Sequence, residues 1–347
     1  MRRSWMEKQK RYSLLAKVLT PAVAGLTLLS LAACGAQGTS NGAASGTASG
    51  ASEGKTSIKV VVAPIQFETA YVAKEKGFFD EAGLTVEIVP GADPSANLAQ
   101  TVSGQADITT ASWGVMTTAT AKGMPVKVIS GNGVVDPNVD NSGILIPKNS
   151  GIKTVADLKG KNVAVVGVNT GGDIPMLQAA AAAGIDPKSI TEIAVPYAGM
   201  QAALEQGTVD AAFAADTFYH QLVDAGFKSI ASPVREFQGN MPVTVWAATD
   251  AWLKSNPGTA KKFNDAMTKA AAFYTDPANV KAIVDITARI KQVDASKVNP
   301  KAYVPVNVSI NLATGQAGID AMKDLGFVTK PLTAEAMLWA DAPRFAK

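Results

Sequence analysis

Candidate ligand-binding residues gather in short stretches that directly follow predicted strands. PIQFET follows the strand predicted at 57–63, ASWG follows the one at 106–109, and GNGVVDP follows the one at 126–130. In open α/β sheets, ligands bind beyond the carboxyl ends of the strands, where loops and helix N-termini converge. The stretches therefore predict a small-molecule site with contacts from Gln66, Phe67, Glu68, Ser112, Trp113 and Asn132.

A further stretch, NTGGDIP at 169–175, lies between a predicted strand and a predicted helix. Gly171 and Gly172 would let backbone N–H groups point at a ligand, and Pro175 suits a first helical turn. The alternative is an ordinary capped helix, with Thr170 or Asp173 as the N-cap. The two interpretations are compatible, because a capped terminus still binds through its remaining amides.

Two series of alternating strands and helices must position these stretches. The first runs from 57 to 130, the second begins at 143, and one more buried strand, VTVWAAT at 243–249, precedes an almost wholly helical C-terminal region. This order predicts an α/β fold with mainly parallel sheets flanked by helices. We expect two lobes, lobe 1 at 57–141 and 243–347 and lobe 2 at 142–242, hinged by two crossovers beside a cleft.

The N-terminal residues have the layout of an export signal. Residues 1–33 hold six basic side chains and one acidic one, and an apolar run from 18 to 33 ends at Cys34, the only cysteine. That run, which includes Pro21, is shorter than the about 20 apolar residues of a membrane span. Leu31-Ala32-Ala33-Cys34 resembles the lipobox of bacterial lipoproteins, which implies a lipid on Cys34. Cleavage after an Ala-x-Ala-like site, with an incidental cysteine, is the alternative.

The residues after Cys34 cannot build a core. Of the 23 residues at 35–57, 19 are Gly, Ala, Ser or Thr, which predicts a flexible tether with a reach of roughly 26 Å. We expect 1–33 to be a lipoprotein signal peptide and 34–56 a lipidated linker, so that the protein is extracytoplasmic and anchored to the cell membrane. The chain carries +3, which becomes −2 without residues 1–33, and no basic patch with aromatics predicts a nucleic-acid partner.

Four longer stretches carry a resemblance to a known family. In this order and spacing they are similar to the substrate-binding proteins of ABC transporters for nitrate, sulfonate, taurine and thiamine-pyrimidine precursors. The resemblance runs from 57 to at least 246 and implies a periplasmic-binding-protein-like type II fold. It also implies that a monomer closes on a small solute and delivers it to an ABC permease and its ATPase. The stretches are YVAKEKGFFDEAGLTVEIV, GQADITTASWG, GIKTVADLKGKNVAV and YAGMQAALEQGTVDAAFAAD.

The same resemblance implies the second wall of the cleft. Its matching positions are Tyr197, Gly199, Asp216 and Thr217. Tyr197 could instead be a core ring, and Asp216 could cap the following helix while it faces the cleft. His220, the only histidine, is interpreted as structural.

The placement of charged residues indicates the kind of solute. An arginine fork often holds a sulfonate, nitrate or phosphonate, but none of the three arginines after Cys34 falls in the predicted cleft stretches. Glu68, Asp173 and Asp216 do. The sequence therefore predicts a neutral or partly cationic polar solute, such as a heterocycle stacked on Trp113 or Phe67.

An enzyme is the main alternative function. The resemblance includes a thiamine-pyrimidine synthase family whose chemistry implies histidine and a cysteine-rich iron site, whereas this chain has one histidine and one cysteine. No Gly-x-Ser-x-Gly nucleophile elbow is present, and no repeats indicate an adhesion module. We therefore expect no enzyme activity, no cofactor and no metal.

Overall fold

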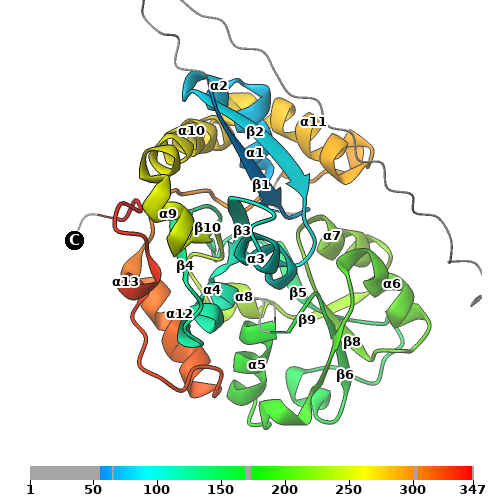
Figure 1. Cartoon of the computed structure of the whole chain (residues 1–347). Helices are drawn as coiled ribbons and strands as arrows, with labels where there is room; N and C mark the ends of the chain where they lie inside the picture. The colour runs from blue at the N-terminus through cyan, green and yellow to red at the C-terminus, as the bar shows by residue number, and fades with distance from the viewer. Residues whose placement is uncertain (1–54, 65, 169–172, 301–302, 346–347) are drawn as a thin grey trace, which may run out of the picture. The chain divides into compact units, whose positions relative to one another are not determined.

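The computed structural model describes residues 55–64, 66–168, 173–300 and 303–345 (Figure 1). The predicted signal peptide and the predicted lipidation site Cys34 lie outside these residues, as do Thr170, Gly171 and Gly172. Residues from Glu53 to Lys347 form one compact unit. Within the described ranges, no helix combines the length and the apolar character needed to cross a membrane.

The first sheet has the strand order β2-β1-β3-β10-β4. β1 runs parallel to β2 and β3, whereas β10 is antiparallel to both of its neighbours, β3 and β4. Four strands therefore share one direction, and only the strand that arrives last in the sequence is reversed. The strands are β1 (Thr56–Val62), β2 (Leu84–Pro90), β3 (Ile108–Ser112), β4 (Val126–Gly131) and β10 (Thr244–Thr249).

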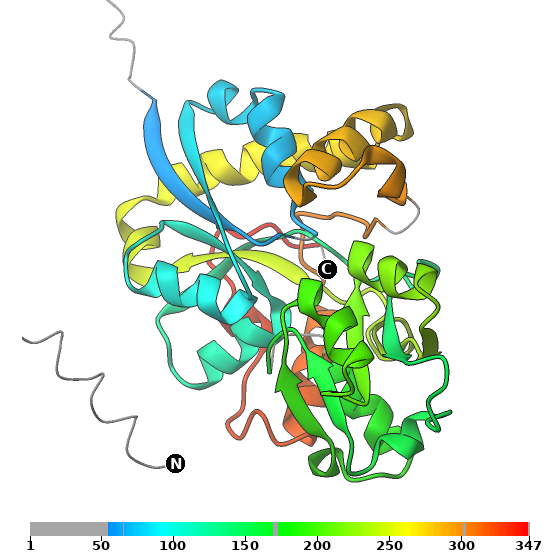
Figure 2. The ribbon, with the colours of Figure 1, turned by 90° about the vertical axis from the view of Figure 1, so that its right-hand side faces the viewer.

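The second sheet repeats this plan with the order β7-β6-β8-β5-β9. β6 is parallel to β7 and β8, and β5 is antiparallel to β8 and β9. In Figure 2 its strands are green, while those of the first sheet run from blue to teal, with β10 in yellow-green. The predicted two-lobed fold with mainly parallel sheets is confirmed. The strands are β5 (Ser142–Ile146), β6 (Asn162–Val165), β7 (Thr191–Ala194), β8 (Ala211–Ala215) and β9 (Lys228–Ala231).

Helices pack on both sheets (Figure 1). Here each lobe means one sheet with the helices packed on it; α1, α10 and α11 pack together in the first lobe, as do α4, α12 and α13. The α-helices are α1 (Glu68–Glu75), α2 (Phe78–Glu81), α3 (Pro94–Val102), α4 (Trp113–Ala121), α5 (Asp173–Ala182), α6 (Tyr197–Glu205), α7 (Asp216–Asp224), α8 (Pro233–Phe237), α9 (Asp250–Ser255), α10 (Pro257–Thr275), α11 (Val280–Lys291), α12 (Leu312–Asp324) and α13 (Ala334–Met337). Short 3-10 helices are η2 (Val155–Leu158), η3 (Pro187–Ser189), η4 (Pro277–Asn279) and η5 (Ala295–Lys297).

Three details differ from the sequence-based expectation. The helix expected in TVADLKG is only the short η2, which begins at a capping box between Thr154 and Asp157 and is followed by Gly160 at φ +73°. β9 and α8 were not expected. The C-terminal region is not almost wholly helical, because the described residues 303–310 form irregular extended chain that pairs with residues 131–134.

The strands of the first sheet place alternate side chains in two apolar layers. Trp246 packs edge-on against the rings of Phe67 and Phe263, at centroid distances of 5.1 and 5.3 Å, in the core beside α1 and α10. Its neighbours Val245 and Ala247 belong to the opposite layer, beside α4 and α12. This alternation is the period of a strand that is buried on both faces, so β10 joins the two layers of the first lobe.

The two crossovers between the sheets are bonded to each other. Val135 on the first crossover donates from its backbone N–H to Met241 O on the second at 3.0 Å, and Asn240 N–H donates back to Val135 O at 2.8 Å. Gly133 must be a glycine here, because a Cβ atom would lie 2.6 Å from Thr244 Oγ1. The connection between the lobes is therefore a narrow, hydrogen-bonded pair of chains.

Glu192 on β7 makes the stability of the second lobe depend on pH. Its Oε1 is buried with no hydrogen-bond partner among the described residues. Burial, and next the charge of Asp173, raise the pKa of Glu192 from 4.5 to about 7. The folded state therefore holds a proton that the unfolded state releases between these two values, so the free energy of unfolding falls as pH rises through this window.

We predict that Glu192→Gln removes this decline. At pH 8 the variant should be more stable than the wild type by about 1 kcal/mol, a figure reduced for partial solvent screening, and at pH 4.5 the two should be equal. Urea unfolding at pH 4.5, 6 and 8 measures the difference, with the exposed Glu205→Gln as the matched control. The same decline in Glu192→Gln as in the wild type would contradict the prediction.

Candidate ligand-binding cavity

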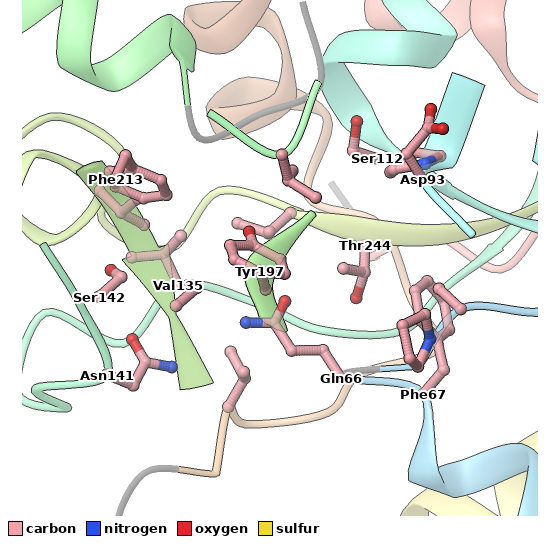
Figure 3. Close-up of a pocket in the computed structure, with 18 of the residues that line it drawn as sticks. Gln66, Phe67, Asp93, Ser112, Val135, Asn141, Ser142, Tyr197, Phe213 and Thr244 are labelled. Carbon is pink, nitrogen blue, oxygen red and sulfur yellow. The ribbon is translucent and has the colours of Figure 1, made fainter. Parts of the chain in front are cut away.

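A cavity lies where strand ends of both sheets and the first crossover meet (Figure 3). It contains about 970 Å³ of empty space, open solvent at its mouth included. Ser112 of β3, Ala215 of β8 and Asn141 of the first crossover all line it. Its walls therefore come from both lobes.

Most of the cavity wall is apolar. Phe67, Val135, Val166, Phe213 and Val304 are among the lining residues, and they come from parts of the chain that are far apart in sequence. Polar lining groups are fewer and include the amides of Gln66 and Asn141 and the hydroxyl groups of Ser112 and Thr244. Such a wall suits a solute with an apolar body and a small number of polar groups.

Gln66 reaches the cavity from an unusual backbone conformation. Its φ is +62°, in the left-handed region that side-chain-bearing residues seldom occupy. The carbonyl oxygen of Gln66 accepts a hydrogen bond from Asn132 Nδ2 at 2.7 Å. This bond compensates for part of the backbone strain, which is on the order of 1 kcal/mol.

Asn132 is the centre of a buried hydrogen-bond network rather than a lining residue. Thr69 Oγ1 donates to Asn132 Oδ1 at 2.8 Å, and Asn132 Nδ2 also donates to Thr244 Oγ1 at 3.0 Å. Thr244 Oγ1 in turn accepts from Gly133 N–H at 2.7 Å. Asn132, only 1% exposed, thus joins the start of α1, the first crossover and β10, all of which carry cavity residues.

Ser112 and Trp113 are adjacent in sequence, but of the two only Ser112 lines the cavity. Ser112 is the N-cap of α4, its Oγ accepts from Val115 N–H at 3.2 Å, and it lines the cavity. Trp113 is 1% exposed, and its Nε1 donates to Gly315 O at 2.9 Å. A Cβ atom at Gly315 would lie 2.7 Å from the Trp113 ring, so this ring packs under α12 and is not part of the described cavity wall.

Tyr197 lines the cavity from the second lobe (Figure 3). Its ring is stacked on Phe218, with centroids 5.5 Å apart and planes inclined by 13°. Burial, followed by the charges of Asp216 and Asp173, raises the pKa of Tyr197. Its hydroxyl group therefore stays protonated at neutral pH and can donate a hydrogen bond.

The remaining predicted residues of the second wall lie outside the cavity lining. Asp173 is completely buried as the first residue of α5, and Gly199 lies within α6, where a Cβ atom would contact Val195 at 3.4 Å. Asp216 and Thr217 are buried at the start of α7.

Glu68 and Asp216, predicted on opposite walls, are brought together by a lysine. Lys291 Nζ lies 3.3 Å from Glu68 Oε1 and 3.0 Å from Asp216 Oδ1. The three side chains are buried next to the cavity residues Phe67 and Ala215 without lining the cavity. Burial, and more weakly the charge of Asp216, raise the pKa of Glu68, whereas Lys291 lowers it.

Three charged residues of the cavity were not predicted. Asp93 and Asp136 line it, as does Arg235 of α8. Arg235 Nη1 lies 3.8 Å from Asp140 Oδ1, and the arginine side chain is 40% exposed. Because α8 was not expected, no sequence signal placed Arg235 at the cleft; the DP at 93–94, an N-cap followed by proline, could have indicated Asp93. Among the described residues, no group of three or more His, Cys, Asp or Glu could hold a metal ion.

A family model described as "NMT1/THI5 like" matches residues 65–279, which include most of the cavity residues. The chain belongs to this family. A search of curated proteins found no match. The prediction that the chain belongs to the family with nitrate, sulfonate and thiamine-precursor binding proteins is confirmed at the level of the family.

Solved structures of other proteins show the same fold as this NMT1/THI5-like chain. The alkanesulfonate-binding protein SsuA from Xanthomonas axonopodis pv. citri, bound to MOPS, has a TM-score of 0.70 at 18% identity, covering 82% of this chain and 98% of that one. The periplasmic nitrate-binding protein NrtA from Synechocystis PCC 6803 has a TM-score of 0.66 at 17% identity, covering 82% and 84%. The desulfurization enzyme DSZB has a TM-score of 0.58 at 14% identity, covering 83% and 97%. Both binding proteins and an enzyme therefore share this fold.

We predict that Asn132→Ala destabilises the NMT1/THI5-like fold by about 3 kcal/mol, because it leaves several buried partners without hydrogen bonds. Urea unfolding measures the loss. Asn138→Ala is the matched control, because Asn138 is exposed and its side chain donates a hydrogen bond to Asp136 at the surface; it should change stability by less than about 0.5 kcal/mol. Equal stabilities of the two variants would show that the network is not needed.

Proposed function

We propose that this protein is an extracytoplasmic solute-binding protein that captures a small solute in the cavity and delivers it to an ABC importer. The observation that carries the proposal is a cavity lined from both lobes, because a solute that contacts both walls favours the closed arrangement. Family membership and the binding proteins with this fold support it. The hinge would be the two hydrogen-bonded crossovers. Residues 57–141 and 243–347 would form one lobe, and residues 142–242 the other.

The sequence before the folded unit supports a lipid-anchored location. Cys34 ends the lipobox-like Leu31-Ala32-Ala33-Cys34, and the Gly-, Ala-, Ser- and Thr-rich residues after it would leave the folded unit free to reach a permease. The proposed partners are therefore the membrane, through a lipid on Cys34, and an ABC permease with its ATPase. A monomer is sufficient, because both cavity walls belong to one chain.

The composition of the wall points to a solute with a flat or apolar body. Phe67, Tyr197 and Phe213 offer rings, and Gln66, Ser112 and Thr244 offer polar groups. We expect a heterocyclic or aromatic solute to lie beside Phe67. Trp113 is not expected to stack on the solute, because its ring faces α12. Asp93 and Asp136 outnumber Arg235 among the charged lining residues, which favours a neutral or partly cationic solute, while Arg235 could hold one anionic group.

An enzyme with this fold is the second candidate, favoured by the resemblance to DSZB. The described cavity lining contains no histidine or cysteine, which supports the carrier instead. Mass spectrometry of the solute after long incubation with the protein distinguishes the two: the carrier returns the solute unchanged, whereas an enzyme returns a product.

Thermal unfolding of residues 53–347, the compact unit, tests capture. We predict that one class within a panel of heterocycles, nucleobases, amines, sulfonates and nitrate raises the melting temperature in a saturable way, because a ligand that binds only the folded state stabilises it. Protein refolded from denaturant, and so free of carried-over solute, is used. No shift with any compound would contradict the predicted solute classes, and a shift only with sulfonates or nitrate would contradict a neutral or partly cationic solute.

We predict that Gln66→Gly weakens binding of that solute about tenfold, the loss expected for one hydrogen bond. Glycine removes the side chain from the cavity and suits the backbone at φ +62°, so the fold should be retained. Isothermal titration calorimetry measures the affinity. Gln292→Gly, at φ +54° on the exposed residue after α11 and outside the cavity lining, is the matched control and should bind like the wild type. Wild-type affinity in Gln66→Gly would remove Gln66 from the site.

A further inference from the structure

Lys291 joins residues from the two lobes. It is the last residue of α11 in the first lobe, and its Nζ donates to Asp216 Oδ1 and Oδ2 and to Thr217 Oγ1, each at 3.0 Å. Asp216 and Thr217 begin α7 of the second lobe. On the side of the first lobe, the same ammonium group lies 3.3 Å from Glu68 at the start of α1. One cation thus contacts the helix N-termini of both lobes.

The ionic cluster of Glu68, Asp216 and Lys291 is closed to solvent. The side chains of Lys291, Glu68 and Asp216 are 4%, 3% and 6% exposed. Tyr274 and Tyr303, whose rings lie 5.5 Å apart, are close enough for Glu68 and Asp216 to raise the pKa of each, after the larger effect of burial. Salt screens a buried ion pair of this kind only weakly, and removal of one partner strongly destabilises the protein because the other charge stays buried.

The backbone of Asp216 has a left-handed conformation, which its contacts in the cluster explain. Its φ is +55°, and its N–H donates to Asn141 O on the first crossover at 2.6 Å. The left-handed conformation is unfavourable for aspartate unless local contacts fix it. Here the carboxylate is directed at Lys291 while the main chain is tied to the connection between the lobes.

The ion pair differs from the apolar contacts between the lobes. Ile174 of α5 in the second lobe packs against Met322 of α12 and Val328, and such apolar contacts are not directional. Hydrogen bonds from one ammonium group to both carboxylate oxygens of Asp216 require a particular separation and orientation. The cluster therefore specifies one relative position of α7 and α11.

We propose that Lys291 is an interlobe latch, whose ammonium group holds Asp216 of the second lobe against α1 and α11 of the first and keeps the protein closed before any solute binds. The latch also determines which solutes have access to the acidic pair. Lys291 Nζ occupies the position between Glu68 and Asp216, so a solute ammonium group reaches both carboxylates only by displacing Lys291. The latch does not depend on the identity of the solute.

Spin labels on the two lobes test the latch directly. Cysteines introduced at the exposed positions Lys74 of α1 and Asp224 of α7, in the mature chain with Cys34→Ser, are the only cysteines, because the natural chain has one. Pulsed electron-spin resonance then measures the distance distribution between the labels in protein refolded from denaturant without added solute. We predict a major short-distance and a minor long-distance population for the parent and, for Lys291→Met, at least a tenfold higher ratio of open to closed molecules.

Two further variants make the result decisive. Lys281→Met is the control, because Lys281 lies on the same helix and pairs with Asp285 at the surface; its distribution should match the parent. Asp216→Asn removes the charge while asparagine tolerates the left-handed backbone, so it should also open the protein and serves if Lys291→Met does not fold. A parental distance distribution in folded Lys291→Met or Asp216→Asn would overturn the latch, whether or not the panel yields a solute.

Discussion

The positions of the two lobes and of the cavity depend on the hydrogen bonds between the two crossovers. Val135 exchanges backbone bonds with Asn240 and Met241, so the chain leaves the first lobe and re-enters it at one place. The cavity opens beside this place. Asn132, which precedes Val135 on the same crossover, connects this crossover to α1 and β10 by hydrogen bonds. Residues that are distant in sequence therefore line one cavity.

Strand and helix periodicity was sufficient to predict most of the fold. The β-branched runs and the glycines after the helices marked nearly all strands of both sheets, and the late strand VTVWAAT indicated the return to the first lobe. The short β9 and α8 were missed because KSIA and PVREF are too brief for a periodic pattern. Residues 303–310 were also misjudged, since their partners lie in 131–134, and local sequence carries no record of such long-range pairing.

The candidate site was predicted only in part, because position at a strand end does not determine where a side chain points. Gln66, Phe67, Ser112 and Tyr197 line the cavity. Trp113 follows Ser112 directly, yet its indole N–H is bonded to Gly315, a partner that no local pattern could indicate. Glu68 and Asp216 were predicted as cleft residues, but their partner Lys291 lies at the end of α11, far away in the sequence, and no local pattern indicated this contact.

The reversed strand β10 also bears on how the chain folds. β3 ends at Ser112, but its neighbour β10 begins only at Thr244, after the whole second sheet. All strands of the second sheet lie within residues 142–231, so that sheet can form from one continuous stretch of chain, whereas the first must wait for a partner from beyond it. Distant pairings of this kind close large loops and slow folding. While the chain folds, the first sheet thus keeps an unpaired strand edge for longer than the second sheet does.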